Sequence, residues 1–203
     1  MALIWVPHSL ASASSTYLLS EDFESGTAPS GWTTGTGRNY AYTPALVGNY
    51  SLGVTGSFVG ATSASFTAQS NAWIFLRIFP GAASTSYTFR LRDGTNVIAS
   101  VEFRSDRVRI THGTATADST GAALTSQSCM WLNYVAGTGS NGLLSMYINK
   151  NSTSETRPSV SASLSNGTST TSVSDIGCYA QGAGNWVFDK IRVSATEIGS
   201  SPT

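Results

Sequence analysis

The feature that most constrains this chain is a short alternation of apolar and polar residues that recurs along most of its length. In residues 87–92, tyrosine, phenylalanine and leucine alternate with threonine and two arginines. A period of two places alternate side chains on opposite faces of a β-strand. The pattern returns in residues 97–103 and 107–111, after a turn signal at 93–95, and no window has the apolar period of an amphipathic helix. The sequence therefore predicts an all-β protein.

Composition narrows the classes of partner. Only 11% of the 203 residues are charged, 11 basic against 11 acidic, while 40% are apolar. Binding to nucleic acid through counterion release needs a concentrated surplus of Lys and Arg, so we exclude nucleic acid as a partner. The apolar fraction is large enough for a folded core. Since no stretch approaches the 18 or so apolar residues of a membrane-spanning helix, we expect no membrane insertion.

The strand pattern continues on both sides of the first three segments. Residues 72–79 are apolar at nearly every position, which predicts a central strand buried on both faces. Residues 151–171 are almost entirely small and polar, and we interpret them as a long surface loop. No linker divides the chain, so we predict a two-sheet antiparallel β-sandwich as a single domain over 17–203, preceded by an extended N-terminal arm over 1–16. The remaining predicted strands are 17–32 with its closing turn, 51–54, 129–135, 142–149, 172–180 and 185–193.

Three segments carry a family resemblance. Residues 131–149 open on Trp, place Val-Ala before a Gly-rich hairpin and end in Tyr-Ile-Asn, followed by Lys150. Residues 187–194 place an Asp before Ile-Arg-Val, and residues 21–32 run from an acidic start to Pro-Ser-Gly-Trp. These segments resemble strands of the concanavalin A-like and laminin G-like jelly rolls found in phage and bacterial surface proteins, where Gly is usual in place of Lys150. The resemblance implies that jelly-roll fold over 17–193, a fold shared by lectins, glucanases, adhesion modules and virion proteins.

The sequence offers no catalytic constellation. The glucanases of this fold carry Glu-x-Asp-x-x-Glu on one strand, and the nearest pair here, Glu102 and Asp106, is best explained by exposed ion pairs with nearby arginines. His112 is the one histidine placed to act as a base, but no Gly-x-Ser-x-Gly elbow accompanies it. Lyases of the resembled fold usually carry a Gln-x-His pair, which is missing. We therefore predict that the protein is not an enzyme, with a glycoside-active enzyme using Glu102 as a minor alternative.

No metal or cofactor is predicted. Cys129 and Cys178 fall short of the four ligands that zinc prefers, and we expect two buried thiols, with a single disulfide as the alternative. The resemblance allows a calcium ion at the sandwich rim, for which Asp93 or Asp118 are the plausible donors. Asp189 lies in a half-buried strand, where we expect a structural hydrogen-bond acceptor rather than a ligand-binding group.

Our first functional hypothesis is a non-catalytic structural protein of a phage or another virus. It would be a capsid decoration or tail-associated module on the virion surface, with other virion proteins as partners. The apolar start is interrupted at Pro7 and His8 and lacks a preceding basic residue, so we expect no signal peptide. The arm would anchor the protein to a neighbouring subunit through three apolar residues, Ile4, Trp5 and Val6.

The second hypothesis is recognition of a surface glycan. A jelly roll can bind a host polysaccharide through aromatic rings on its rim loops, either on a virion or as a secreted, extracellular carbohydrate-binding module or lectin. The best candidates for exposed rings are Tyr40, Tyr42 and Tyr50, although a core position remains the favoured interpretation of each.

Overall fold

The computed structural model describes residues 17–81, 87–104, 106–119, 124–200 and 202. Within these ranges the chain forms twelve β-strands and no helix, so the all-β prediction is confirmed. It follows that these ranges contain no helix long and apolar enough to cross a bilayer. The arm predicted over residues 1–16 lies outside the described residues, with its candidate anchors Ile4, Trp5 and Val6.

Every pair of neighbouring strands in the described chain is antiparallel. In chain order the strands are β1 (Leu19–Glu21), β2 (Arg38–Tyr42), β3 (Ser51–Thr62), β4 (Asn71–Phe79), β5 (Tyr87–Arg92), β6 (Val97–Phe103), β7 (Val108–His112), β8 (Ala115–Ser119), β9 (Ser128–Val135), β10 (Gly142–Asn149), β11 (Ala162–Gly167) and β12 (Asp175–Ser194).

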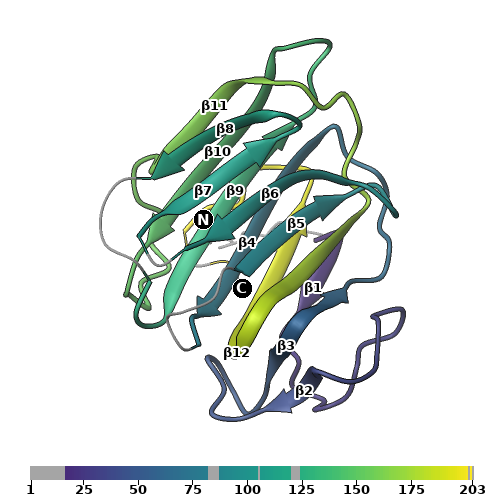
Figure 1. Cartoon of the computed structure of the whole chain (residues 1–203), viewed down its shortest axis with the longest axis vertical. Coiled ribbons are helices and arrows are strands. Elements are labelled where there is room, and N and C mark those ends of the chain that lie inside the picture. The colour runs from purple at the N-terminus through teal and green to yellow at the C-terminus, as the bar shows by residue number, and fades with distance from the viewer. Residues whose placement is uncertain (1–16, 82–86, 105, 120–123, 201, 203) are drawn as a thin grey trace, which may run out of the picture.

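The strands form the two layers of a sandwich (Figure 1). One layer contains β4, β9, β10 and β11, and the other contains β5, β6, β7 and β8. The long strand β12 joins them, because its residues 175–180 pair with β5 and its residues 187–194 pair with β4. Strand β3 runs beside β12, and β2 pairs with β3. At the opposite edge β8 meets β11, so the predicted two-sheet jelly roll is confirmed.

Apolar side chains fill the space between the layers because each strand turns alternate residues inward. The inward residues of β4 include Leu76, which is fully buried. On the other face of β4, Phe75 packs on Trp131 with ring centroids 4.8 Å apart, and Ile198 of the C-terminal segment belongs to the same cluster. The prediction that this strand is buried on both faces is therefore confirmed. Other fully buried core residues are Phe89, Val101, Ile110, Leu132 and Met146.

The predicted strand list was incomplete at the sheet edges. The segment 151–171, interpreted as a loop, contains β11, and strands β2 and β8 were not predicted. All three end a run of paired strands, and β11 buries a single large apolar side chain, Leu164. An edge strand with so little apolar contact leaves almost no alternation to detect. The predicted strands 172–180 and 185–193 are parts of β12.

Candidate functional site

Arginines gather on the outward face of the layer formed by β5, β6, β7 and β8. At the β7 end of this face they are paired with acids. Arg109 Nε lies 2.7 Å from Asp118 Oδ1, Arg104 Nη2 lies 2.8 Å from Glu102 Oε2, and Arg107 contacts Asp106. The ion pairs predicted for Glu102 and Asp106 are thus confirmed. These contacts compensate the charge at this end of the face.

The other end of the same face is hollowed. A groove of about 240 Å³ lies where β3, β12 and β5 run side by side, and we call it the Arg90 groove. Its lining combines three arginines, an aromatic ring and two strand glycines that contribute no side chain. The lining residues are Arg38, Gly60, Ala61, Thr62, Arg90, Arg92, Thr95, Val97, Gly177 and Tyr179.

Arg90 is one of two cations of the groove that lack an acidic partner, the other being Arg38. Its guanidinium carbon lies 3.9 Å from the centre of the Tyr179 ring, a cation–π contact that fixes the head group over the ring. All eleven acidic residues belong to the described part of the chain, and none of them forms an ion pair with Arg90 or Arg38. Burial lowers the pKa of the half-buried Arg90 guanidinium, with Tyr179 acting in the opposite direction. A bound anion would offset this unfavourable environment.

The other two arginines are held in place by the protein. Arg38 donates from Nε to the Gly60 carbonyl and from Nη1 to the Thr34 carbonyl at 2.9 Å. Arg92 Nη1 lies 3.2 Å from Asp175 Oδ1, and its Nη2 donates to the carbonyl of Gly94. The walls of the groove are therefore fixed before any ligand arrives, which reduces the entropy lost on binding.

This arrangement suits an anion with oxygen atoms at its edge. A guanidinium presents its donors in a planar fork that matches a carboxylate, and a hydrogen bond between charged groups is stronger than a neutral one. Because the whole chain has no formal net charge, the attraction is local to the groove. The sequence analysis did not identify these residues as a binding site. Its only indication was that Arg90 and Arg92 lie on the outward face of one predicted strand.

The three tyrosines proposed as glycan-binding residues lie in different surroundings. Tyr40 is 7% exposed, packs on Phe23 and Trp32, and donates its hydroxyl to the Thr33 carbonyl. It therefore takes the core position, and its candidate role in glycan binding is corrected. Its ring sits in an aromatic cluster that excludes a ligand. Tyr42 is half-buried and lines a second hollow.

Tyr50, also half-buried, lies against the backbone at Gly26, where an added Cβ would be 3.1 Å from the ring. Glycan contact by Tyr42 and Tyr50 stays a prediction. The hollow lined by Tyr42, which we call the rim pocket, measures about 330 Å³ and is mostly apolar. Its other lining residues are Pro44, Ala45, Leu46, Phe79, Ser126, Gln127 and Val187.

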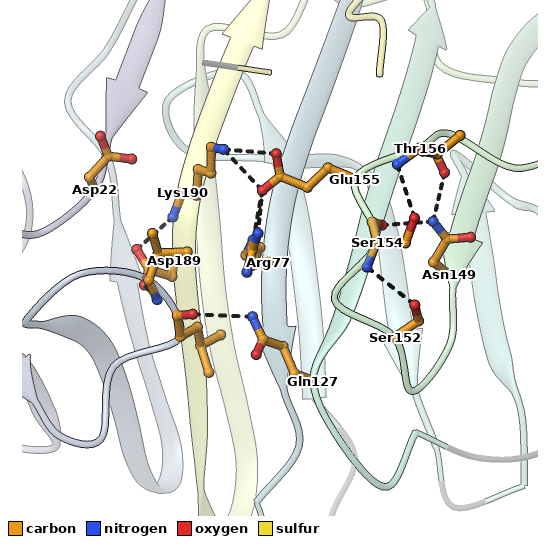
Figure 2. Close-up of polar contacts among 12 residues, drawn as sticks. Asp22, Arg77, Gln127, Asn149, Ser152, Ser154, Glu155, Thr156, Asp189 and Lys190 are labelled. Carbon is orange, nitrogen blue, oxygen red and sulfur yellow. Dashed lines mark hydrogen bonds and ion pairs between the residues drawn. The ribbon is translucent and has the colours of Figure 1, made fainter. Parts of the chain in front are cut away.

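Asp189 is the structural acceptor that the sequence suggested. Its carboxylate is fully buried and accepts hydrogen bonds from the Val47 amide and the Ser51 hydroxyl, each at 2.8 Å. It also accepts one from the Lys190 amide at 2.7 Å (Figure 2). Burial raises its pKa from 3.8 to about 6, against the opposing effect of these three donors. Both carboxylate oxygens of Asp189 therefore accept hydrogen bonds from the protein itself.

Glu155 is held on the outer face of the other layer by two cations. Its carboxylate lies 2.6 Å from Arg77 Nη2 and 2.8 Å from Lys190 Nζ, as Figure 2 shows. Burial alone would raise the pKa of Glu155, but Lys190 and Arg77 outweigh it and hold the pKa below its usual value. Asn149 donates to the carbonyls of Ser154 and Thr156 in the same loop. This cluster is internally satisfied and fastens the loop to the sheet.

The histidine considered as a base is part of the core. His112 is fully buried, its ring stacks on Tyr134, and the Ser169 amide donates to its Nδ1 while Nε2 lies 3.0 Å from the Val135 carbonyl. These contacts assign the proton to Nε2 and leave no face for a substrate. Cys129 and Cys178 are buried and unpaired, as expected, and burial raises the pKa of Cys129 to about 11.

The carboxylates considered for calcium are engaged elsewhere. Asp93 accepts hydrogen bonds from Asn96, and Asp118 pairs with Arg109 and Arg107. Over the ranges that the structure describes, no three residues of the types His, Cys, Asp and Glu are placed to hold a metal ion.

Comparison with known proteins places the chain by its fold. No protein-family model matches it, and no curated protein is similar to it in sequence. Among solved structures it is similar to an endo-β-1,4-glucuronan lyase from the fungus Trichoderma reesei, with TM-score 0.60, 11% identity, and coverage of 89% of this chain and 96% of that one.

Two further solved structures give the same result. An alginate lyase has TM-score 0.58, 9% identity and coverage of 90% and 98%, in the same order. The carbohydrate recognition domain of Emp46p in its metal-free form has TM-score 0.56, 12% identity and coverage of 88% and 97%. The fold is therefore the concanavalin A-like jelly roll that the sequence resembles. At these identities the likeness shows the fold alone.

The comparison also corrects one expectation. We predicted that the protein is not an enzyme, and this prediction is contradicted because several similar structures are polysaccharide lyases. The prediction used the absence of a Gln-x-His pair. At about one identical residue in ten, similar folds need not share any local motif, so a missing motif does not exclude activity.

Proposed function

We propose that this protein binds a polysaccharide that carries carboxylate groups, a polyuronate, in the Arg90 groove. The observation that carries the proposal is the half-buried Arg90 guanidinium, which has no acidic partner within the chain and shares the groove with two further arginines. A uronate supplies the matching anion, because its carboxylate suits the guanidinium fork.

The similar structures support this choice of ligand. Two of them are named as lyases of glucuronan and of alginate, which are polymers of uronic acids, and a third is a carbohydrate recognition domain. Neutral glycans would leave Arg90 without an anion. We therefore expect the protein to prefer polyuronates over neutral glucans of the same length.

Removing the unpaired cation tests the proposal. Calorimetric titration with oligoglucuronate and oligoalginate should give weaker binding for Arg90→Gln by about 10-fold or more, since a charged hydrogen bond contributes roughly 1.5–3 kcal/mol. Arg109→Gln is the matched control, because it removes a cation from the same face that is already paired with Asp118. Equal affinities of Arg90→Gln and the parent, or equal binding of a neutral glucan, would refute the proposal.

Cleavage of the bound polymer is a second candidate function. The observation that favours it is the Tyr179 side chain beside the unpaired Arg90, since a phenol can exchange a proton while a cation neutralises the uronate carboxylate. β-Elimination would leave an unsaturated uronate that absorbs in the ultraviolet. Incubation of alginate or glucuronan with the parent and with Tyr179→Phe measures it, and no absorbance change with the parent would exclude cleavage of those two polymers.

Display on a virus particle is the remaining prediction from the sequence. It is supported by the low charge and by the jelly-roll resemblance to phage surface proteins, and it is compatible with binding of a host or environmental polyuronate. A secreted carbohydrate-binding module or lectin is the alternative. Co-sedimentation of the full chain with particles of its source virus, or its absence from them, distinguishes the two.

A further inference from the structure

A glycine lies at the floor of the Arg90 groove, in the interior of a strand. Gly177 pairs with Thr62 of β3 on one side and with Arg90 of β5 on the other, so β12 is a central strand here. Glycine weakens a strand interior, because it has no side chain to pack and loses more conformational freedom than other residues. Its presence in this position needs a physical reason.

The backbone conformation does not require glycine at this position. Gly177 does not adopt the left-handed region, in contrast to Gly56 of β3 at φ +110°. Packing does not require it either. A Cβ built at Gly177 would lie 3.4 Å from Arg92 Cδ and 3.5 Å from Thr62 Cγ2, which are ordinary van der Waals distances.

Packing does explain Gly60, the second glycine at the floor of the groove. A Cβ at Gly60 would lie 2.2 Å from Cδ2 of Tyr179, because the ring rests directly on this residue. Gly60 is thus explained by the close approach of Tyr179, whereas a Cβ at Gly177 would make only ordinary van der Waals contacts. A glycine within a strand that neither backbone nor packing demands is typical of a place where a ligand approaches the backbone.

We infer that Gly177 is the residue that lets a uronate ring reach the floor of the Arg90 groove. The inference rests on the proposed function and adds how the ligand lies. With no side chain at 177, a uronate ring can rest on the backbone of β12 between Thr62 and Tyr179, at a depth where its carboxylate reaches the Arg90 guanidinium. A side chain at 177 would raise the ring away from the floor and separate the two charges.

Two substitutions of increasing size measure this effect. We expect Gly177→Ala to weaken oligoglucuronate binding several-fold and Gly177→Val to weaken it at least 20-fold in calorimetric titrations. Both variants should unfold at the temperature of the parent or above it, since alanine and valine favour strands more than glycine does. Thr111→Ile is the control, because Thr111 follows Arg90 and Ser100 across the same face of the sheet but lies outside the groove lining.

The outcomes separate this inference from the proposed function. If the parent binds no polyuronate, the proposed function fails, and the inference fails with it. If the parent binds and Gly177→Val binds equally well, only the inference is overturned. A lower unfolding temperature of Gly177→Ala would show that the fold itself requires glycine here and would also overturn the inference. Loss of binding with retained stability, and normal binding by Thr111→Ile, is the result we expect.

Discussion

A buried carboxylate makes the stability of this fold depend on pH. The Asp189 side chain is fully buried, and burial raises its pKa from 3.8 to about 6. The folded state therefore holds the proton more tightly than the unfolded chain. The contribution of Asp189 to stability is fully present below about pH 4 and is lost as the pH rises through 6.

We expect Asp189→Asn to remove this dependence. Relative to the variant, the parent should gain about 2–3 kcal/mol of unfolding free energy between pH 7 and pH 4, as a shift of about two pKa units implies. Urea unfolding at several pH values measures both proteins, and the other carboxylates cancel in the difference. Parallel profiles of parent and variant would show that Asp189 does not titrate in this range.

At the scale of elements, one carboxylate fastens the loop between β10 and β11 to the outer face of the sheet. Glu155 is nearly buried and bridges Arg77 and Lys190. We expect Glu155→Gln to cost about 1–3 kcal/mol of stability, because the substitution leaves two cations side by side without their anion. It should also speed protease cleavage within the loop, as measured by limited proteolysis.

An exposed ion pair provides the comparison for that prediction. Asp106 contacts Arg107 at 3.6 Å and its side chain is 62% exposed. We expect little change in stability from Asp106→Asn, since exposed pairs are screened by water and salt. Similar effects of Asp106→Asn and Glu155→Gln would mean that the loop is held by other contacts.

The elements differ in how well the sequence predicts them, for a physical reason. Strand β5 and strand β6 alternate large apolar residues with polar ones because one face packs on the core, and both were predicted with their observed bounds. Strand β11 pairs only at the edge of its sheet, and its Ser, Ala and Asn residues carry no such signal. Alternation of apolar and polar residues arises because one face of a strand is buried. It is therefore weakest in strands that bury the least apolar surface.

The Arg90 groove was harder to predict than any strand. Its cations come from β2 and β5, and its ring and floor from β3 and β12. The lining residues furthest apart in the sequence, Arg38 and Tyr179, are separated by 141 positions. The sequence placed Arg90 on an outward face but could not bring Gly177 beside it. The pairing of β12 with both β3 and β5 creates the site, and pairing between distant strands is not encoded in local pattern.

At the scale of the whole molecule, the absence of net charge limits how the groove attracts its ligand. The chain has 11 basic and 11 acidic residues, and the charge of Arg92 is compensated by Asp175. Polyuronate binding should therefore release few counterions. We expect its affinity to fall with salt along a log–log slope between about −1 and −2, shallower than for a protein with a basic face.

The same charge balance predicts selectivity among polyanions. Double-stranded DNA presents phosphates along a stiff rod and attracts proteins through an extended basic surface, which this fold does not offer over its described residues. In fluorescence competition at low salt, DNA should leave bound oligoglucuronate in place, whereas free alginate should displace it. Displacement by both polymers at equal charge concentration would show that binding depends on charge alone. The shape of the groove floor would then make no contribution to recognition.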